Sequence, residues 1–502
     1  SIRAGGAREE EGFMATRAEV GEVGLERRAV GLPTAIGTTF GLIVASTVLA
    51  SVTAGFFASY VFIAALGVGL LAMYLQSMSF AELATMIPKA GSMNEYVRAG
   101  LGPFFATLTV LVGYIAVQLF PTTAEAYTPS AIVKGFLWTD GPSTTFWVIV
   151  FVVLVALLNV AGIRPYGAVE VALTVFIVLS LLVFGFIGLA GLGSSDPIGS
   201  AFPDIPFTWS LFSTLLGIAM FTFVGMEYTC PLAEEIENPG RNIPLGIFLG
   251  LTLVTLPILI WGLGATRYVP SDQLGAFSPV AHMEAAIAIL GDTGKWWMAI
   301  ISLAATLSTL NALIAGIPRI LYGMSLTRQL PRAFGYLLPS TRAPVVGIAI
   351  VALMPILMNV FIDLGKSTNF IELILAGVLG WATAYAIIHV TLIILRQREP
   401  QARRPFRSVA VPIPQLLGMG LLALAAFKIF PDPVVRDHIY RDYGIFLGVA
   451  IVLSLVVNLV FGTSLRDQFR PVPLVEVYRE TELIDEELPP PVEPGGPHIR
   501  HD

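Results

Sequence analysis

Long apolar stretches without charge constrain the fold of this chain more than any motif does. Eleven stretches contain no Asp, Glu, Lys or Arg. A helix needs roughly 20 mostly apolar residues to cross about 30 Å of hydrocarbon, and its backbone groups must be satisfied within the segment. The first stretch, 29–81, has room for two helices with a break near 58–60. Each of the others has room for one: 99–124, 141–163, 171–195, 205–226, 242–266, 296–318, 343–362, 373–395, 408–427 and 443–465. The sequence therefore predicts an all-α polytopic membrane protein with twelve transmembrane helices.

The composition excludes several classes of function. The chain is 55% hydrophobic and 13% charged, with a mean hydropathy of +0.78, whereas soluble domains carry about 25% charged residues. A lipid bilayer is therefore the expected surrounding. The basic residues are scattered over short loops, so we expect no nucleic-acid partner. No nucleotide loop, metal-ligand cluster or nucleophile–base motif stands out, so we expect neither an enzyme nor a cofactor. The single cysteine, Cys230, excludes an intrachain disulfide and is expected to be a small packing residue.

The distribution of basic residues predicts the orientation. An even number of spans places both termini on one side, and short loops rich in Lys and Arg stay in the cytoplasm. With the termini inside, 22 of the 29 Lys and Arg residues lie on the cytoplasmic side and 7 lie outside. We therefore expect a multi-pass protein of the cell membrane with both termini cytoplasmic. The N-terminal tail is 1–31, and the C-terminal tail, 466–502, is acidic and Pro-rich, which is typical of disorder.

Two spans carry residues that interrupt helices. The first contains glycines and many small hydroxyl residues over 31–57, and the sixth has Gly225 and Pro231 on either side of Glu227. Interrupted segments at corresponding places in two halves of a chain point to a transporter binding site. The alternative is that the glycines only allow close helix packing. Glu227 favours a functional break, because an ionisable group at that depth is costly.

The deep acids are Glu125, late in the third span, and Glu227, and no Lys or Arg at that depth could pair with them. A buried carboxylate without a cation either protonates or binds one. Two roles stay open: a proton-coupling site, or a counter-ion for a cationic amine. Glu170 is expected to be a structural partner of Arg164 or the inner loops. Glu372 and His389 are expected to be interfacial or packing residues.

Other polar residues also lie within the spans. Ser308 and Thr309 in the eighth span could hold sodium together with carbonyls of the first span, although such hydroxyls often bond to their own helix. Asn311, Tyr114 and Gln118 could line a pocket or join helices to one another.

Three segments carry a family resemblance. Residues 80–104 read FAELATMIPKAGSMNEYVRAGLGPF, 221–244 read FTFVGMEYTCPLAEEIENPGRNIP, and 307–331 read LSTLNALIAGIPRILYGMSLTRQLP. They resemble the loop between spans 2 and 3, span 6 with the stretch that follows it, and the end of span 8 in the amino acid–polyamine–organocation superfamily. The likeness covers about 32–465 and includes amino-acid and polyamine permeases and arginine/agmatine-type antiporters.

The resemblance implies a leucine-transporter-like fold. Its two inverted repeats of five helices would cover 32–191 and 192–396, two further helices would cover 397–465, and alternating access would take place around spans 1 and 6. It also implies a substrate site at the two breaks. The residues expected there are Val44, Ala45, Ser46, Thr47, Phe221, Thr222, Phe223, Gly225, Glu227 and Asn311. Phe221 falls where the family often has an aromatic lid, and Glu227 falls on the acid of arginine/agmatine antiporters.

This sequence departs from the family pattern at two informative places. Many members have Gly-Ser-Gly or Gly-Ser-Ala in span 1, where this chain has Ala45-Ser46-Thr47. The glycines allow backbone N–H groups to approach a substrate carboxylate, and added side chains crowd that site. Some proton-coupled members carry a lysine in span 5, where Ile177 aligns here.

These observations predict a secondary active transporter. The favoured substrate is a cationic amine, such as a polyamine, an alkanolamine or a basic amino acid, with a proton as the coupling ion. The alternative is a neutral amino-acid permease in which Glu227 only carries a proton. A channel or a sensor built on a transporter scaffold is a more distant alternative.

Overall fold

The computed structural model describes residues 24–361, 370–430 and 432–480. Within these residues the chain is helical, and its only β-type pairing is an isolated bridge between Val30 and Ile236. Eight helices are long and apolar enough to cross a membrane, and four shorter apolar helices accompany them. The predicted all-α architecture is confirmed.

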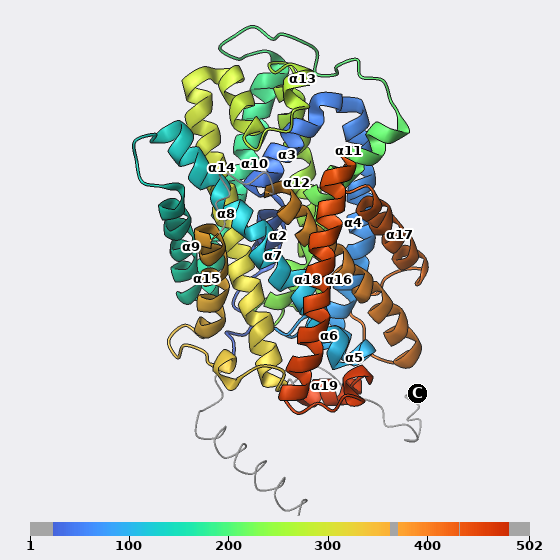
Figure 1. Ribbon diagram of the computed structural model, residues 1–502. Coiled ribbons are helices and arrows are strands. Elements are labelled where there is room, and N and C mark those ends of the chain that lie inside the picture. The colour runs from blue at the N-terminus through green and yellow to red at the C-terminus, as the bar shows by residue number, and fades with distance from the viewer. Residues whose placement is uncertain (1–23, 362–369, 431, 481–502) are drawn as a thin grey trace, which may run out of the picture.

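The helices group into the twelve predicted spans (Figure 1). Spans 1 and 2 are α2 (Leu32–Ile43) with α3 (Ser46–Gly55), and α4 (Ser59–Met86). Span 3 is α6 (Pro103–Val110), the π-helix η2 (Leu111–Ile115), α7 (Ala116–Leu119) and α8 (Pro121–Ile132). Spans 4 and 5 are α9 (Thr144–Val160) and α10 (Ile163–Ala190). Span 6 is α11 (Trp209–Thr222) with the 3₁₀ helix η4 (Met226–Leu232). Spans 7 to 12 are α12 (Pro239–Ala265), α14 (Ala281–Leu326), α15 (Val345–Phe361), α16 (Phe370–Arg398), α17 (Ile413–Phe427) and α18 (Pro433–Val460).

Both interruptions lie near the middle of their spans. In span 1, Val44 (φ −85°, ψ 32°) and Ala45 (φ −51°, ψ 150°) leave the helical conformation and separate α2 from α3. In span 6, Gly225 has a φ of +98°, in the left-handed region that favours glycine. A Cβ added to Gly225 would lie 2.1 Å from Cδ2 of Leu42, so a larger residue would also clash with span 1. Gly225 thus allows both the turn and the close approach of the two breaks.

The half-helices α2 and η4 are joined to each other by hydroxyl groups. The Thr39 hydroxyl donates to the Met226 carbonyl (3.2 Å) and lies 2.9 Å from the Thr229 hydroxyl. The Thr229 hydroxyl in turn donates to the Ala35 carbonyl (3.0 Å). Just beyond these helices, the Val30 carbonyl accepts from the Glu237 N–H (2.8 Å). The N-terminal half of span 1 and the C-terminal half of span 6 therefore form one packed unit.

The family-like segments serve mainly to join helices at one end of the bundle. The Glu82 carboxylate at the end of α4 pairs with Arg396 (2.6 Å) in the last turn of α16 and with Arg404 (2.9 Å) in the loop that follows. Glu235 forms a buried ion pair with Arg319 of α14. Desolvating a carboxylate is expensive, and the arginines offset that cost here.

The C-terminal tail differs from its prediction as disordered. Residues 466–480 pack against α5 (Met93–Leu101) and end in α19 (Leu474–Glu480), at the opposite end of the bundle from the short helix α13 (Ser271–Leu274) (Figure 1). The Val472 N–H donates to the Arg98 carbonyl (3.0 Å), and the side chains of Leu474 and Val477 are buried. These apolar residues precede the acidic Pro-rich part, and burying them orders the segment. The rest of the tail, 481–502, lies outside the described residues.

Candidate functional site

The break in span 6 places a half-satisfied carboxylate inside the bundle. Glu227 is completely buried. Its Oε2 accepts a hydrogen bond from the Tyr385 hydroxyl (2.5 Å), and the same hydroxyl accepts from the Gly225 N–H (3.0 Å). Oε1 has no hydrogen-bond partner among the described residues. Tyr385 thus fixes the carboxylate against the break and leaves one of its oxygens able to accept from a ligand.

Other polar atoms near this break also lack partners within the described chain. They are the hydroxyls of Tyr114 and Tyr228 and the indole N–H of Trp381. The rings of Tyr114 and Tyr228 lie 5.2 Å apart, which joins span 3 to η4. Buried polar groups are normally hydrogen-bonded. An accumulation of unpaired ones beside an unwound helix indicates a place for a polar solute or water.

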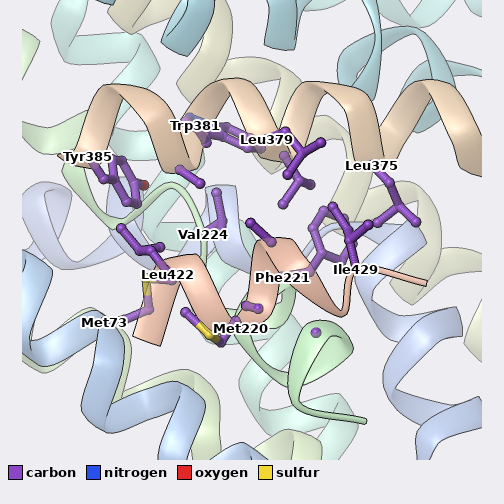
Figure 2. A pocket seen from close by; sticks show the side chains of 15 residues that line it. Met73, Met220, Phe221, Val224, Leu375, Leu379, Trp381, Tyr385, Leu422 and Ile429 are labelled. Carbon is purple, nitrogen blue, oxygen red and sulfur yellow. The ribbon is translucent and has the colours of Figure 1, made fainter. Parts of the chain in front are cut away.

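Phe221 faces an apolar pocket next to this polar region. The pocket is bounded by α4, α11, α16 and α17, and Phe221 lies in it close to Leu379 and Ile429, whereas Tyr385 and Trp381 line its other end (Figure 2). Its volume of about 30 Å³ is room for a water molecule or two. The pocket is therefore too small for an amine solute as it stands.

The break in span 1 holds the second deep acid. The N–H groups of Ser46 and Thr47, at the start of α3, donate to Oε1 (2.8 Å) and Oε2 (3.0 Å) of Glu125. The Thr306 hydroxyl of α14 donates to Oε1 as well (2.5 Å). Glu125 reaches this position from α8, which begins at Pro121 after a bend in span 3. The positive end of the α3 dipole and three donors favour the charged form of this carboxylate.

A third buried acid lies against α2, the N-terminal half of span 1. Glu170 of α10 accepts hydrogen bonds from the Ser308 hydroxyl and from Asn311 Nδ2 (2.7 Å). A Cβ added to Gly41 of α2 would lie 1.9 Å from the Glu170 carboxylate. The predicted pairing with Arg164 is wrong, because Arg164 bonds to Glu26 (2.7 Å) instead. Glu170 lies six residues after Arg164, almost two helical turns further along α10. The Arg164 side chain, at the end of this helix, therefore does not reach it.

The structure brings some predicted site residues together and separates others. Val44, Ala45, Ser46 and Thr47 lie at the span 1 break, and Thr222, Phe223, Gly225 and Glu227 lie at the span 6 break. Asn311 belongs to the Glu170 group, where its Oδ1 also accepts from Asn159 (2.9 Å). Gln118 donates to the Val351 carbonyl (2.8 Å) and so joins α7 to α15. The Thr309 hydroxyl donates to the Gly41 carbonyl of span 1 (2.8 Å). This places the hydroxyl beside a span 1 carbonyl, as the sodium alternative requires, and that alternative stays a prediction.

Sequence reasoning missed Tyr385 and Thr306, which bond to the two deep carboxylates. A signal for Tyr385 exists in the sequence, because a tyrosine in the middle of span 10, four residues after Trp381, must place its hydroxyl against a buried partner. Thr306 carries no such signal, since a span threonine usually bonds to its own helix.

Comparison with known proteins agrees with this arrangement. The family model described as amino acid permease matches residues 30–431. The chain belongs to the amino acid permease family. This permease is 25% identical to the branched-chain amino acid permease BcaP of Bacillus subtilis, over 71% of its own length and 77% of that protein. It is also 25% identical to the vacuolar cationic amino acid transporter 4 of Arabidopsis thaliana, over 74% of its own length but only 62% of that longer protein.

A solved structure shows the fold directly. The permease matches Mhp1, a nucleobase-cation-symport-1 family transporter captured in a closed conformation with bromovinylhydantoin bound, over 92% of this chain and 98% of that one. The TM-score is 0.50 and the sequence identity is 17%, so this likeness concerns the fold alone. The permease is thus a multi-pass membrane transporter that acts on a small molecule, and it is not an enzyme.

Proposed function

We propose that this permease moves a small cationic amine across the membrane by alternating access around the breaks of spans 1 and 6, with a proton as the coupling ion. The observation that carries the proposal is the state of Glu227, which is fully buried, bonded on one oxygen to Tyr385 and without a partner for the other oxygen among the described residues. An ammonium group would bond to that free oxygen by a charge-assisted hydrogen bond. The partnerless hydroxyls of Tyr114 and Tyr228 could accept from its remaining donors.

Binding and proton movement are linked in this scheme. A buried carboxyl without a cation favours its neutral form, and an approaching ammonium favours the charged form. Amine binding would therefore release a proton from Glu227. We further propose that 32–191 and 192–396 are the two inverted repeats that rock against each other, and that Phe221 covers the solute.

A neutral amino-acid permease is the second candidate. The similarity to BcaP favours it, and Glu227 would then carry a proton without touching the solute.

The experiment that separates these functions is a binding screen on the purified chain. Amines and amino acids are tested by thermal shift, since a ligand of the folded state raises its apparent stability. Glu227→Gln keeps the shape of the side chain and removes its charge. We expect it to weaken binding of the amine at least 100-fold. Glu372→Gln, which changes a buried acid bonded to His438 elsewhere, should bind as the unsubstituted protein does.

The opposite outcome for Glu227→Gln supports the second candidate. A variant that binds its solute as tightly as the unsubstituted protein and has lost only the pH dependence has a proton carrier at this position. The cationic-amine proposal would then be abandoned.

We also propose that the protein lies in the cytoplasmic membrane with both termini inside. The one cysteine, Cys230, is buried, so single cysteines can be introduced and labelled without background. Labels applied outside intact cells should reach cysteines placed in 193–204 and 271–292 and should not reach 396–407. Labelling of the arginine-rich loop 396–407 from outside would reverse the orientation.

A further inference from the structure

We infer that Glu125 takes the position of a substrate carboxylate at the N-terminus of α3, so that the transported amine carries no carboxylate beside its ammonium group. This role for Glu125 rests on the proposed function, in which Glu227 receives the ammonium.

The start of α3 has the geometry of a carboxylate site. The first hydrogen bond within this helix runs from the Leu49 N–H to the Ala45 carbonyl (2.9 Å). The N–H groups of Ser46 and Thr47 therefore have no partner in the helix, and they point along its axis with the positive end of its dipole. Free N–H groups at a helix start bind anions readily. A solute carboxylate entering the break of span 1 would bond to these two groups.

The protein itself supplies the anion at this position. The two N–H groups donate to different oxygens of Glu125, at 2.8 Å and 3.0 Å, and the Thr306 hydroxyl adds a third bond at 2.5 Å. Glu125 is only 2% exposed, so these bonds are shielded from water. Charge-assisted bonds of this kind are about twice as strong as neutral ones. A second carboxylate would find both N–H donors occupied and would face a like charge.

The remaining polar groups suit a cation. Glu227 presents an oxygen without a partner, and no Lys or Arg in the described chain is bonded to either carboxylate. A zwitterionic amino acid would satisfy Glu227 with its ammonium and leave its own carboxylate without a donor at α3. The corresponding amine, which lacks that carboxylate, avoids this cost. The two breaks together therefore select a decarboxylated amine over its parent amino acid.

Matched pairs of compounds test this selection. Agmatine and arginine, cadaverine and lysine, and ethanolamine and serine differ within each pair only by the carboxylate. Their affinities for the purified full chain are measured by calorimetry or thermal shift. In each pair that binds, we expect the amine to bind at least tenfold more tightly than the amino acid. An amino acid that binds as tightly as its amine overturns the inference.

Substitution of Glu125 should open the position. Glu125→Ala frees the two N–H groups, so the affinity ratio of amine to amino acid should fall at least tenfold. Glu125→Gln keeps the size of the side chain and removes its charge, so it should also lower the affinity ratio of amine to amino acid. Thr306→Val is the control, because it leaves the carboxylate on the two N–H groups and should keep the preference. An unchanged ratio in folded Glu125→Ala and Glu125→Gln also overturns the inference, and if neither folds, the pairs on the unsubstituted protein decide.

The two levels of proposal fail in different ways. If lysine or arginine binds as tightly as its amine and Glu227→Gln abolishes that binding, the cationic site stands and the role of Glu125 is wrong. If Glu227→Gln leaves binding unchanged, the proposed function is wrong, and the role of Glu125 falls with it. Absence of binding by all six compounds contradicts both.

Discussion

The breaks of spans 1 and 6 each bring a carboxylate to unwound backbone, but they leave the two carboxylates in opposite conditions. Glu125 accepts hydrogen bonds on both oxygens, two of them from the start of α3. Glu227 accepts one bond from Tyr385, and its second oxygen has no partner in the described chain. Burial is equal for both, so the donors around each acid make the difference. A satisfied carboxylate anchors a helix, and a half-satisfied one is available to a solute.

The pH dependence of amine binding should show the largest contrast between the two acids. If each bound amine displaces one proton from Glu227, affinity rises by up to about tenfold per pH unit while that carboxyl is protonated. The amine keeps its own charge up to about pH 10. Affinity should therefore increase from acid to neutral pH and then level off, as measured by calorimetry over that range.

The same pH titration of two variants shows which of the two acids releases the proton. Glu227→Gln should lose the slope together with most of the binding, and Glu125→Gln should keep the slope. A slope that disappears in Glu125→Gln and survives in Glu227→Gln would exchange the roles of the two acids.

Without ligand, substitution of Glu125 should lower the stability of the protein, whereas substitution of Glu227 should not, and this difference should be smaller than the one in amine binding. Glu125→Gln removes charge-assisted bonds to α3 and should lower the free energy of unfolding by about 1–3 kcal/mol. Without amine the Glu227 carboxyl is already neutral in this scheme, and Glu227→Gln replaces it with a neutral amide of the same shape, so the melting temperature of that variant should stay the same or rise. Thermal unfolding of both variants in detergent, without amine, measures this difference. Equal losses in the two variants would show that both acids are structural.

Phe221→Ala should have the smallest effect. Its ring contacts no charged group in the pocket it lines, so its loss should weaken apparent affinity by roughly tenfold through lost apolar contact, on the order of 1–2 kcal/mol. The protein should still fold. Phe186→Ala, a change of an aromatic residue that is 60% exposed on α10, is the control. Transport kinetics that are unchanged in a folded Phe221→Ala protein would reject the lid.

The sequence predicted the features that depend on local chemistry. Uncharged runs determine where spans lie, and Gly225 beside Glu227 indicated the break in span 6, because a glycine near a costly charge favours unwound backbone. The resemblance, and not local chemistry, located the span 1 site at Ala45-Ser46-Thr47, and the absence of the family's glycines there already placed binding of a substrate carboxylate in doubt. The sequence did not predict that Glu125 would occupy the start of α3.

The partners of the buried acids depend on tertiary packing, which spacing does not reveal. Glu125 meets α3 from a span that is interrupted at Phe120, before Pro121, and whose register is altered by the π-helix Leu111–Ile115. Tyr114 and Gln118, four residues apart, would share a face of a regular helix. Here Tyr114 meets Tyr228, and Gln118 meets α15. Glu170 was expected to pair with Arg164 or the inner loops because they are near in sequence, whereas its partners come from α14, 138 and 141 residues away.

The joining of α2 to η4 divides span 1 mechanically. The half that contains α2 is bonded to span 6 through Thr39 and Thr229, and the half that contains α3 is bonded to span 3 through Glu125. Only Val44 and Ala45 connect the two halves. We propose that the unit of α2 and η4 moves about this two-residue connection during transport, while α3 keeps its anion. The amine would then be released by motion of the wall that carries Glu227, and the charge at α3 would stay in place throughout the transport cycle.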